Sequence, residues 1–211
     1  MTPKQVFYEN QANTIIENLK KRQMEGYYCP TSADAVKKAM ELIAKDSIVA
    51  YGGSVTLSET GILTALRERK DITFYERSGK PSEEVQKIYR DTFSCDYYFT
   101  STNAITLDGE LVNIDGNGNR VAAMIFGPAN VIVVTGMNKI VTTTQEAIDR
   151  VRNIAAPPNC NRLDYKTPCA SIGRCAHCFS PESICSQTVI TRRSGIPGRI
   201  KILFVGEELG Y

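Results

Sequence analysis

The chain has 211 residues, of which 42% are hydrophobic and 23% are charged, and its formal net charge is +2. This length suits one large domain or one domain with an appendage, and the apolar content is enough for a core. So small a net charge gives no argument for binding nucleic acid or an anionic membrane. No segment approaches the roughly 20 consecutive apolar residues of a membrane helix. The first ten residues also lack the apolar stretch of a signal peptide, so we expect a cytoplasmic protein.

The N-terminal segment is predicted to be helical. Thr2 is a good N-cap with Pro3 at the first helical position, and Gly26 is the expected stop. The apolar stripe of this helix is imperfect, so it is expected to pack at the domain edge or against a second subunit of a homodimer. A short extended segment at 27–30 follows, and Thr31 then opens a second amphipathic helix.

Ser47–Tyr51 is predicted to be a strand that runs directly into Gly52 and Gly53, with a helix beginning near Ser58. A strand, a glycine turn and a helix in this order direct free N–H groups at an anion. The spacing is neither that of a Walker loop nor that of a dinucleotide fingerprint. A tight turn without a ligand is the alternative interpretation.

The stretch from Tyr97 to Val141 is the most informative part of the chain. Asp108-Gly109 lies between two alternating runs and predicts a hairpin with a two-residue turn, in which both central positions need a positive φ. The apolar runs Val121–Phe126 and Val131–Thr135 are typical of strands that are covered on both faces. Upstream of this stretch, 72–76 is predicted to be a strand and Ser82 to open a helix.

Asp115–Arg120 is a polar turn attached to these buried strands. Its two glycines expose backbone N–H groups, and the guanidinium of Arg120 can bind a carboxylate or a phosphate. Polar turns at the ends of buried strands indicate a ligand pocket. An ordinary solvated loop is the alternative.

The predicted elements combine into an α/β fold with a layered, mostly parallel sheet and flanking helices. Thr143 and Glu146 form a capping box for a helix expected to stop before Pro157-Pro158. Residues 199–206 supply a last strand. We therefore divide the chain into an α/β domain at 1–156, a cysteine-rich excursion at 157–198 and a return to the sheet at 199–211.

The excursion carries a cluster of cysteines in the pattern C-x5-C-x2-C-x6-C, with Cys160 upstream as a fifth. Several thiolates on a short polar segment make sense if they share a soft metal, whose binding energy also folds the segment. The predicted metal ligands are Cys169, Cys175, Cys178 and Cys185. The other two cysteines, Cys29 and Cys95, adjoin strands and are interpreted as packing residues.

The spacing leaves the metal open. A CxxC pair preceded by a nearby cysteine is similar to plant-type iron–sulfur motifs. Zinc sites more often have two such pairs, and only Cys175 and Cys178 form one here. His177, inside that pair, is a candidate ligand or a solvated residue. Free or redox-active thiols are the remaining interpretation.

Three segments together resemble the lactate-utilisation (LUD) domain family. They are GGSVTLSETG at 52–61, STNAITLDGELVNIDGNGNRVAA at 101–123 and GMNKIV at 136–141. The tail PCASIGRCAHCFSPESIC resembles a stand-alone branch of the family with a C-terminal cysteine motif. The resemblance covers nearly the whole chain and implies a fold like that of the NagB/RpiA/CoA-transferase group.

By this resemblance, a small anionic ligand would bind where the first glycine turn faces the Asn103 and Arg120 segments. Glu59 and Asp115 are the candidate acid/base residues. The predicted ligand-binding residues are Gly52, Gly53, Ser54, Thr56, Asn103, Gly116, Asn119, Arg120 and Lys139. Simpler roles are a helix-end charge for Glu59, turn closure for Asp115 and solvation for Lys139.

The resemblance supports three functions. The first is a component of a redox system that uses lactate or a related hydroxy acid, with an iron–sulfur cluster or zinc and with electron-transfer partners. The second is a transferase or isomerase acting on a CoA ester or a sugar phosphate, with a structural zinc site and with Glu59 or Glu110 as nucleophile. The third is a non-catalytic scaffold subunit.

Overall fold

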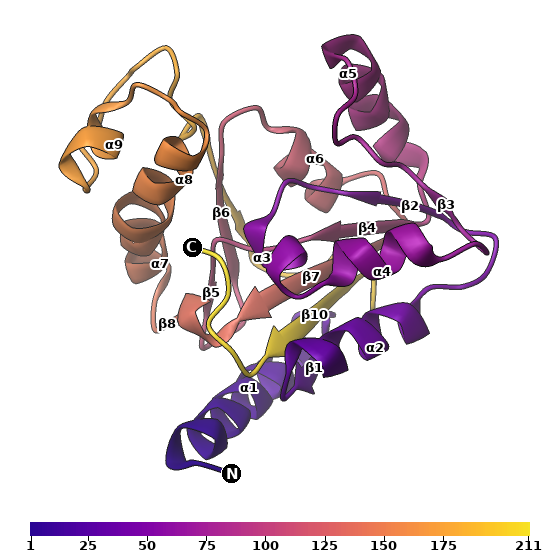
Figure 1. Ribbon diagram of the computed structural model, residues 1–211. Coiled ribbons are helices and arrows are strands. Elements are labelled where there is room, and N and C mark those ends of the chain that lie inside the picture. Colours follow the sequence, from indigo (N-terminus) through magenta and orange to yellow (C-terminus); the bar gives the residue numbers. More distant parts are fainter.

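A six-stranded sheet, in which every pair of neighbouring strands is parallel, forms the centre of the computed structural model, which describes residues 1–211 (Figure 1). The strand order is β1-β10-β7-β4-β2-β3. The strands are β1 (Glu25–Cys29), β2 (Ile48–Tyr51), β3 (Thr73–Phe74), β4 (Tyr97–Thr100), β7 (Asn130–Gly136) and β10 (Ile200–Val205). The predicted α/β fold with a mostly parallel sheet is confirmed.

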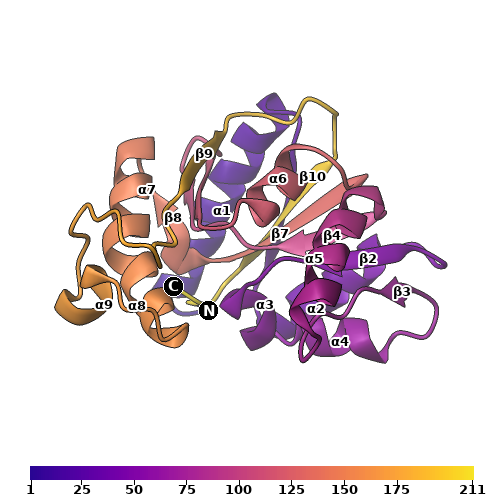
Figure 2. The ribbon, with the colours of Figure 1, turned by 90° about the horizontal axis from the view of Figure 1, so that it is seen from above.

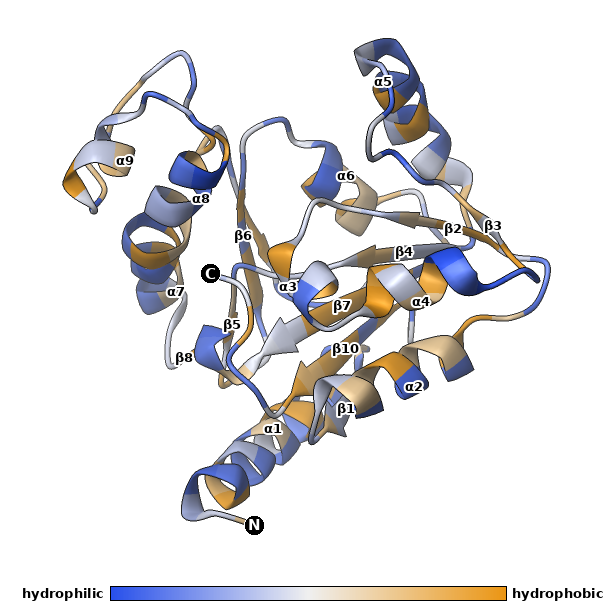
Figure 3. Cartoon of the chain, in the orientation of Figure 1, coloured by the Kyte–Doolittle hydropathy of each residue, from blue (hydrophilic) through white to orange (hydrophobic).

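Helices cover both faces of this sheet. On one face, α1 (Pro3–Lys21) and α6 (Asn119–Ile125) bury Ile15, Leu19 and Met124 against the strands. On the other face lie α2 (Ser32–Leu42), α3 (Val55–Glu59) and α4 (Ile62–Glu68). The strands are the most hydrophobic part of the chain, as Figure 3 shows. Because alternate strand residues point to opposite faces, each strand supplies both cores.

A second sheet, which the sequence did not predict, stands beside the first. Its order is β8-β5-β6-β9, and its strands are β5 (Ala104–Thr106), β6 (Leu111–Asp115), β8 (Ile140–Val141) and β9 (Gln187–Thr191). The helix α7 (Thr144–Arg150) packs on it, with Ala147 buried against Ala104 and Val112. The strand β9 has no fully buried residue, so its sequence carries no apolar signal.

The helix predicted to stop before the two prolines continues through them. After α7 come a π-helical turn at Val151–Ala155 and α8 (Ala156–Arg162). Pro157 and Pro158 lie in the first turn of α8, where a missing N–H is tolerated. The helical run therefore crosses the boundary drawn at residue 157. The short α9 (Pro168–Ile172) follows, and Figure 2 shows α7, α8 and α9 together on one side of the molecule.

Two other local predictions were wrong. Val121–Phe126 is not a strand but most of α6, because Gly118 with φ 84° starts a helix there and Asp115 accepts a hydrogen bond from the Val121 N–H. The first helix ends at Lys21 rather than Gly26, and Gly26 lies inside β1.

The predicted hairpin at Asp108-Gly109 is present, but its turn differs. Gly109 has φ 88° whereas Asp108 does not have a positive φ, so only one left-handed residue is used. The Gly109 N–H donates to the Thr106 carbonyl and the Thr106 N–H to the Glu110 carbonyl, which makes a three-residue loop at 107–109. The loop is a turn followed by a left-handed glycine, one of the common longer hairpin connections.

The remaining elements follow the predictions more closely. The predicted helix near Ser58 is divided into α3 and α4 by Gly61, which has φ 81°. The strand predicted at 72–76 is reduced to β3, and α5 (Ser82–Asp91) begins where expected. The helix α5 buries no residue and projects from the body of the molecule (Figure 1). None of the helices has both the length and the apolar character needed to cross a bilayer.

Arg199 fixes the end of α6 that is opposite to Arg120. Its buried guanidinium donates to the carbonyls of Ala123, Met124 and Pro128. Replacement of Arg199 by Met should lower the free energy of unfolding by about 3 kcal/mol, because three buried acceptors lose a charged donor. Chemical denaturation measures the change, with the exposed Arg193→Met as the matched control. Equal stabilities of the two variants would contradict this role.

Candidate functional site

The predicted site residues gather at the carboxyl ends of the parallel strands. Gly52 follows β2, Ser101 follows β4 and Lys139 follows β7, while the C-terminal tail follows β10. Loops at this edge of an α/β sheet meet over one region, which is where such folds bind ligands. Figure 1 shows the C-terminus lying between α3 and α7, above these strand ends.

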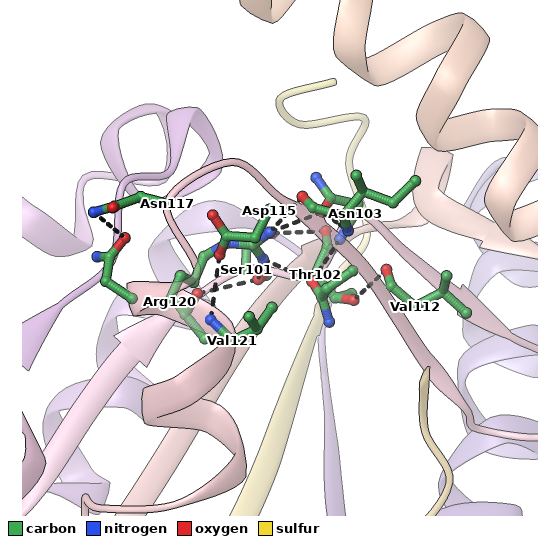
Figure 4. Close-up of polar contacts among 12 residues, drawn as sticks. Ser101, Thr102, Asn103, Val112, Asp115, Asn117, Arg120 and Val121 are labelled. Carbon is green, nitrogen blue, oxygen red and sulfur yellow. Dashed lines mark hydrogen bonds and ion pairs between the residues drawn. The ribbon is translucent and has the colours of Figure 1, made fainter. Parts of the chain in front are cut away.

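Arg120 joins the loop after β4 to the strand β6 (Figure 4). Its Nη1 donates to the Ser101 carbonyl and to Asn113 Oδ1, at 3.1 and 2.6 Å. Its Nη2 donates to Asn103 Oδ1 and to the Ile114 carbonyl, at 2.9 and 3.1 Å. The guanidinium is thus engaged on both sides by protein acceptors, and its direct effect is to hold these loops in place.

Asp115 serves the same turn. Its Oδ2 lies 3.4 Å from the Nε of Arg120 and accepts a hydrogen bond from the Val121 N–H in the first turn of α6. These contacts fit the simpler role of turn closure that the sequence left open. Asn119 is the first residue of α6, and its Oδ1 accepts a hydrogen bond from Asn117.

Asn113 contributes an unused hydrogen-bond donor. Its side chain is fully buried, and its Oδ1 accepts hydrogen bonds from Arg120 and from the Asn103 N–H. Its Nδ2 is buried without any partner. An unpaired buried donor is costly, and one that persists beside polar loops points to a missing acceptor.

Lys139 is the most perturbed cation of the site. Its side chain is buried, and its Nζ donates to Thr56 Oγ1 at 2.8 Å and to Ser101 Oγ at 3.1 Å. Burial, followed by the charges of Arg150 and Arg120, lowers the pKa of Lys139 from 10.5 to about 7, and Glu59 opposes this shift. The predicted residues Thr56 and Lys139 are therefore in contact, and Lys139 is not solvated.

Arg150 is a second buried cation close to Lys139. The residue is 7% exposed, and its guanidinium donates to the carbonyls of Asn138 and Asn103. Burial lowers its pKa to about 10. Neither Arg150 nor Lys139 makes an ion pair, whereas Arg120 is paired with Asp115. The region thus holds more buried positive charge than it neutralises.

The turn of Gly52 and Gly53 closes against the same network. A Cβ on Gly52 would lie 2.5 Å from the Tyr98 hydroxyl and 3.3 Å from Cγ of Arg120, so only glycine fits. Ser54 caps α3 by accepting a hydrogen bond from the Leu57 N–H. The glycine turn and the Arg120 turn, which are far apart in the sequence, are therefore in contact.

The C-terminal tail lies across this region. The Gly210 N–H donates to Glu59 Oε2 at 2.6 Å, and the Leu209 carbonyl accepts a hydrogen bond from Thr56 Oγ1 at 3.4 Å. A Cβ on Gly210 would lie 3.3 Å from Nζ of Lys139. The tail thus holds Glu59, an exposed residue, where its charge acts on Lys139 without forming an ion pair.

The five cysteines of the excursion also come together. The Sγ atoms of Cys160 and Cys169 are 3.9 Å apart. Burial, followed by the nearby Cys160, Cys169, Cys175 and Cys178, raises the pKa of Cys185 to about 11. No three His, Cys, Asp or Glu side chains are arranged as metal ligands in the structure. The cluster includes Cys160, while His177 is exposed.

This cysteine segment is attached to the Arg120 turn. The backbone of Ile184 lies so close to Gly116 that a Cβ there would be 3.0 Å from the Ile184 Cα. The Ser186 N–H donates to the Asp115 carbonyl, after which β9 pairs with β6. Gly116 therefore has a packing role. Cys185 lies between Ile184, which packs on Gly116, and Ser186, which is hydrogen-bonded to Asp115.

Comparisons with known proteins give the family. The family model described as the LUD domain matches residues 12–205. The chain belongs to the LUD domain family. No curated protein matches it.

One solved structure shares the fold of this LUD domain over nearly its whole length. It is a DUF162-family protein from Deinococcus radiodurans, with a TM-score of 0.54 and 10% sequence identity, covering 94% of this chain and 97% of that one. Ribose 5-phosphate isomerase from Plasmodium falciparum is similar with a TM-score of 0.34 and 17% identity, covering 53% of this chain and 52% of that one. The eIF2B delta subunit from Chaetomium thermophilum has a TM-score of 0.34 and 18% identity, covering 66% and 54%. Scores of 0.34 carry no conclusion.

Several residues of this LUD site carry no signal in the sequence. Arg150 lies on α7 at a position that resembles an ordinary last-turn cation, and Asn113 is in a strand. Tyr98 and Ser101 belong to the site because β4, which carries Tyr98 and ends just before Ser101, is central in the sheet. Glu110, a nucleophile considered for the transferase alternative, forms an ion pair with Arg22 at 3.4 Å instead.

Replacement of Arg120 by Met should destabilise the LUD domain even without a ligand. The change leaves the acceptors of Ser101, Asn103, Asn113 and Ile114 without their charged donor, so the free energy of unfolding should fall by about 3 kcal/mol. Urea denaturation measures this, with the exposed Arg90→Met as control. Unchanged stability would show that the network does not hold the loops.

Proposed function

We propose that this LUD domain binds a small carboxylate, of the lactate or related hydroxy-acid class, at Lys139, and that it serves in a redox system together with its cysteine cluster. The observation that carries the proposal is the uncompensated buried charge of Lys139 and Arg150. A buried charge normally has a partner, and unpaired ones concentrate at functional sites. A bound carboxylate would provide the missing negative charge.

The neighbouring groups suit such a ligand. The ammonium of Lys139 has three N–H donors, and two of them donate to the hydroxyls of Thr56 and Ser101. The third is left for a ligand oxygen. The free Nδ2 of Asn113, a residue of β6 whose Oδ1 accepts a hydrogen bond from Arg120, is a further donor. Glu59 is the better of the two candidate bases, because Asp115 is occupied by Arg120 and α6.

Calorimetric titration with L-lactate and with pyruvate tests this proposal. The wild-type protein should bind at least one of them, and Lys139→Met should weaken binding by roughly tenfold or more, because a charged hydrogen bond is lost. The exposed Lys37→Met is the matched control and should bind like the wild type. Absence of binding to the wild type, or equal binding by both variants, would refute the site.

Binding should also depend on pH near neutrality. The carboxylate of the ligand is ionised throughout the range from pH 6 to 8, whereas Lys139, with a pKa of about 7, loses its proton as the pH rises. Affinity should therefore be highest below pH 7 and fall above it, by up to about tenfold per pH unit. Titrations across this range measure the slope. Lys139→Met should give a flat profile, and a slope that survives in this variant would assign the pH dependence to another group.

The metal centre is the second half of the proposal. The donor set is five thiols on one short segment, and the separation of Cys160 and Cys169 is close to the roughly 3.8 Å expected for two sulfurs on one tetrahedral metal. By their chemistry the thiols of Cys169, Cys175, Cys178 and Cys185 suit a soft metal, with Cys160 as the additional candidate. An iron–sulfur cluster bound there would supply one-electron transfer to a partner protein, and zinc would supply a structural cross-link.

Metal content distinguishes these alternatives. Protein purified without oxygen should contain stoichiometric metal, and Cys169→Ser should lose most of it because a soft ligand is removed. Iron, sulfide and zinc analysis with visible absorption gives the identity. Cys29→Ala, which alters a buried cysteine of the main core, should retain the metal. Wild-type protein without metal would refute the metal centre, and protein that contains zinc alone would refute the electron-transfer role.

The transferase alternative draws on one specific observation. An amine with a pKa of about 7 is partly neutral at neutral pH, and a neutral lysine is a nucleophile for carbonyl groups. Labelled acyl-CoA that modifies Glu59, or a carbonyl substrate trapped on Lys139 by borohydride, would favour this function over hydroxy-acid binding. A protein that binds none of these ligands but assembles with partner proteins would be the scaffold subunit.

A further inference from the structure

Arg77 is a charged group that neither the sequence motifs nor the proposed site includes. It lies two residues after Tyr75 in the loop that follows β3, at the same edge of the sheet as the proposed site. The central carbon of its guanidinium lies 4.9 Å from the centre of the Tyr51 ring and 5.6 Å from that of the Tyr89 ring. Its Nη1 donates to the Tyr89 hydroxyl at 3.1 Å. The two rings and this hydrogen bond together restrict the position of the guanidinium.

Arg77 has no anionic partner. The adjacent carboxylate, Glu76, is occupied by the Tyr51 hydroxyl, by Arg67 and by the Ser78 N–H. Arg77 makes no ion pair, and its Nε is buried without any hydrogen-bond partner. Tyrosine rings attract a guanidinium but do not neutralise it. Two of its three nitrogens, Nε and Nη2, thus have no protein acceptor, and they provide the geometry that binds oxyanions in a bidentate manner.

One of these two nitrogens, Nη2, lies next to the glycine turn. A Cβ on Gly53 would lie 3.1 Å from Nη2 of Arg77, and the Gly53 N–H has no acceptor in the protein. The hydroxyl of Tyr98 adjoins Gly52, and the charges of Arg120 and Arg77 both act on it: burial raises the pKa of Tyr98 and both arginines oppose the rise. Arg77 therefore extends the positive region from Lys139 and Arg120 across the glycine turn to β3.

We propose that Arg77, the Gly52-Gly53 turn and the Tyr98 hydroxyl form a phosphate-binding subsite, so that the ligand of this domain carries a phosphate group in addition to the group bound at Lys139. The proposal rests on the anion site at Lys139 and deepens it by naming the substrate class, a phosphorylated small molecule. A single carboxylate such as lactate has only one anionic group and would leave Arg77 without a partner. A phosphate monoester offers several oxygens to the guanidinium fork and to the free N–H of Gly53.

Calorimetric titration of the full-length protein with inorganic phosphate tests the subsite. Arg77→Gln should raise the dissociation constant of phosphate by roughly tenfold or more, since a bidentate charged contact is removed. Arg90→Gln makes the same change in charge at an exposed position one residue from Tyr89, and it should bind phosphate like the wild type. Melting temperatures of both variants identify any loss of folding.

Gly53→Ala provides a second test from a different loop. Gly53 does not have a positive φ, so alanine fits the backbone, but its methyl group would lie in the space beside Nη2 of Arg77. This variant should weaken phosphate binding without lowering the melting temperature. Equal phosphate affinities of the wild type, Arg77→Gln and Gly53→Ala would overturn the subsite, and so would a wild-type protein that binds no phosphate.

Two further variants separate this inference from its foundation and from a competing surface. Lys139→Met should weaken lactate or pyruvate binding but not phosphate binding, whereas Arg77→Gln should do the reverse. A basic hollow of about 370 Å³ lies elsewhere, lined by Asn18, Lys21, Arg22, Asp108, Arg192 and Arg193. Phosphate binding that is lost in Arg192→Gln and kept in Arg77→Gln would assign the phosphate to that hollow and overturn the proposal.

Discussion

The guanidinium of Arg120 is the contact on which the arrangement of the site depends. It donates hydrogen bonds to the loop after β4 and to β6, and its Nε adjoins the carboxylate of Asp115. Those partners lie 5 to 19 positions away in sequence, so the contact converts separate loops into one rigid edge. Because charged hydrogen bonds in a half-buried setting are strong, this single side chain fixes the ends of both sheets relative to each other.

Around this fixed edge the domain retains positive charge without neutralising it. Lys139, Arg150 and Arg77 come from three different loops and helices, and none of them has a carboxylate partner. Such an arrangement is unfavourable for stability alone, since the desolvation of each cation is not offset. It is expected where a protein is preorganised for an anion, because the ligand then provides the compensating charge on binding. Both proposals follow from this imbalance.

The cysteine segment is part of the same construction. Its last residues run over Gly116 and enter β9, which completes the second sheet beside β6. A metal bound by these thiols would therefore stiffen the turn that carries Arg120, in addition to any role in electron transfer. The family model spans this segment together with the α/β body, so the segment is part of the LUD domain.

The sequence by itself determined the family, the α/β class and the cysteine cluster, because these depend on local patterns and on the order of motifs. It also placed Gly52, Thr56, Arg120 and Lys139 in one site, which the structure brings together. It could not assign α6, since an apolar run suits a helix or a strand equally and Gly118 decided the matter. Nor could it identify Arg77 as part of a site. It also could not distinguish an arginine whose donors are taken up by protein acceptors, such as Arg120, from one with free donors, such as Arg77. Hydrogen-bond partners come from residues distant in the chain, so only the tertiary structure decided how each charge is used.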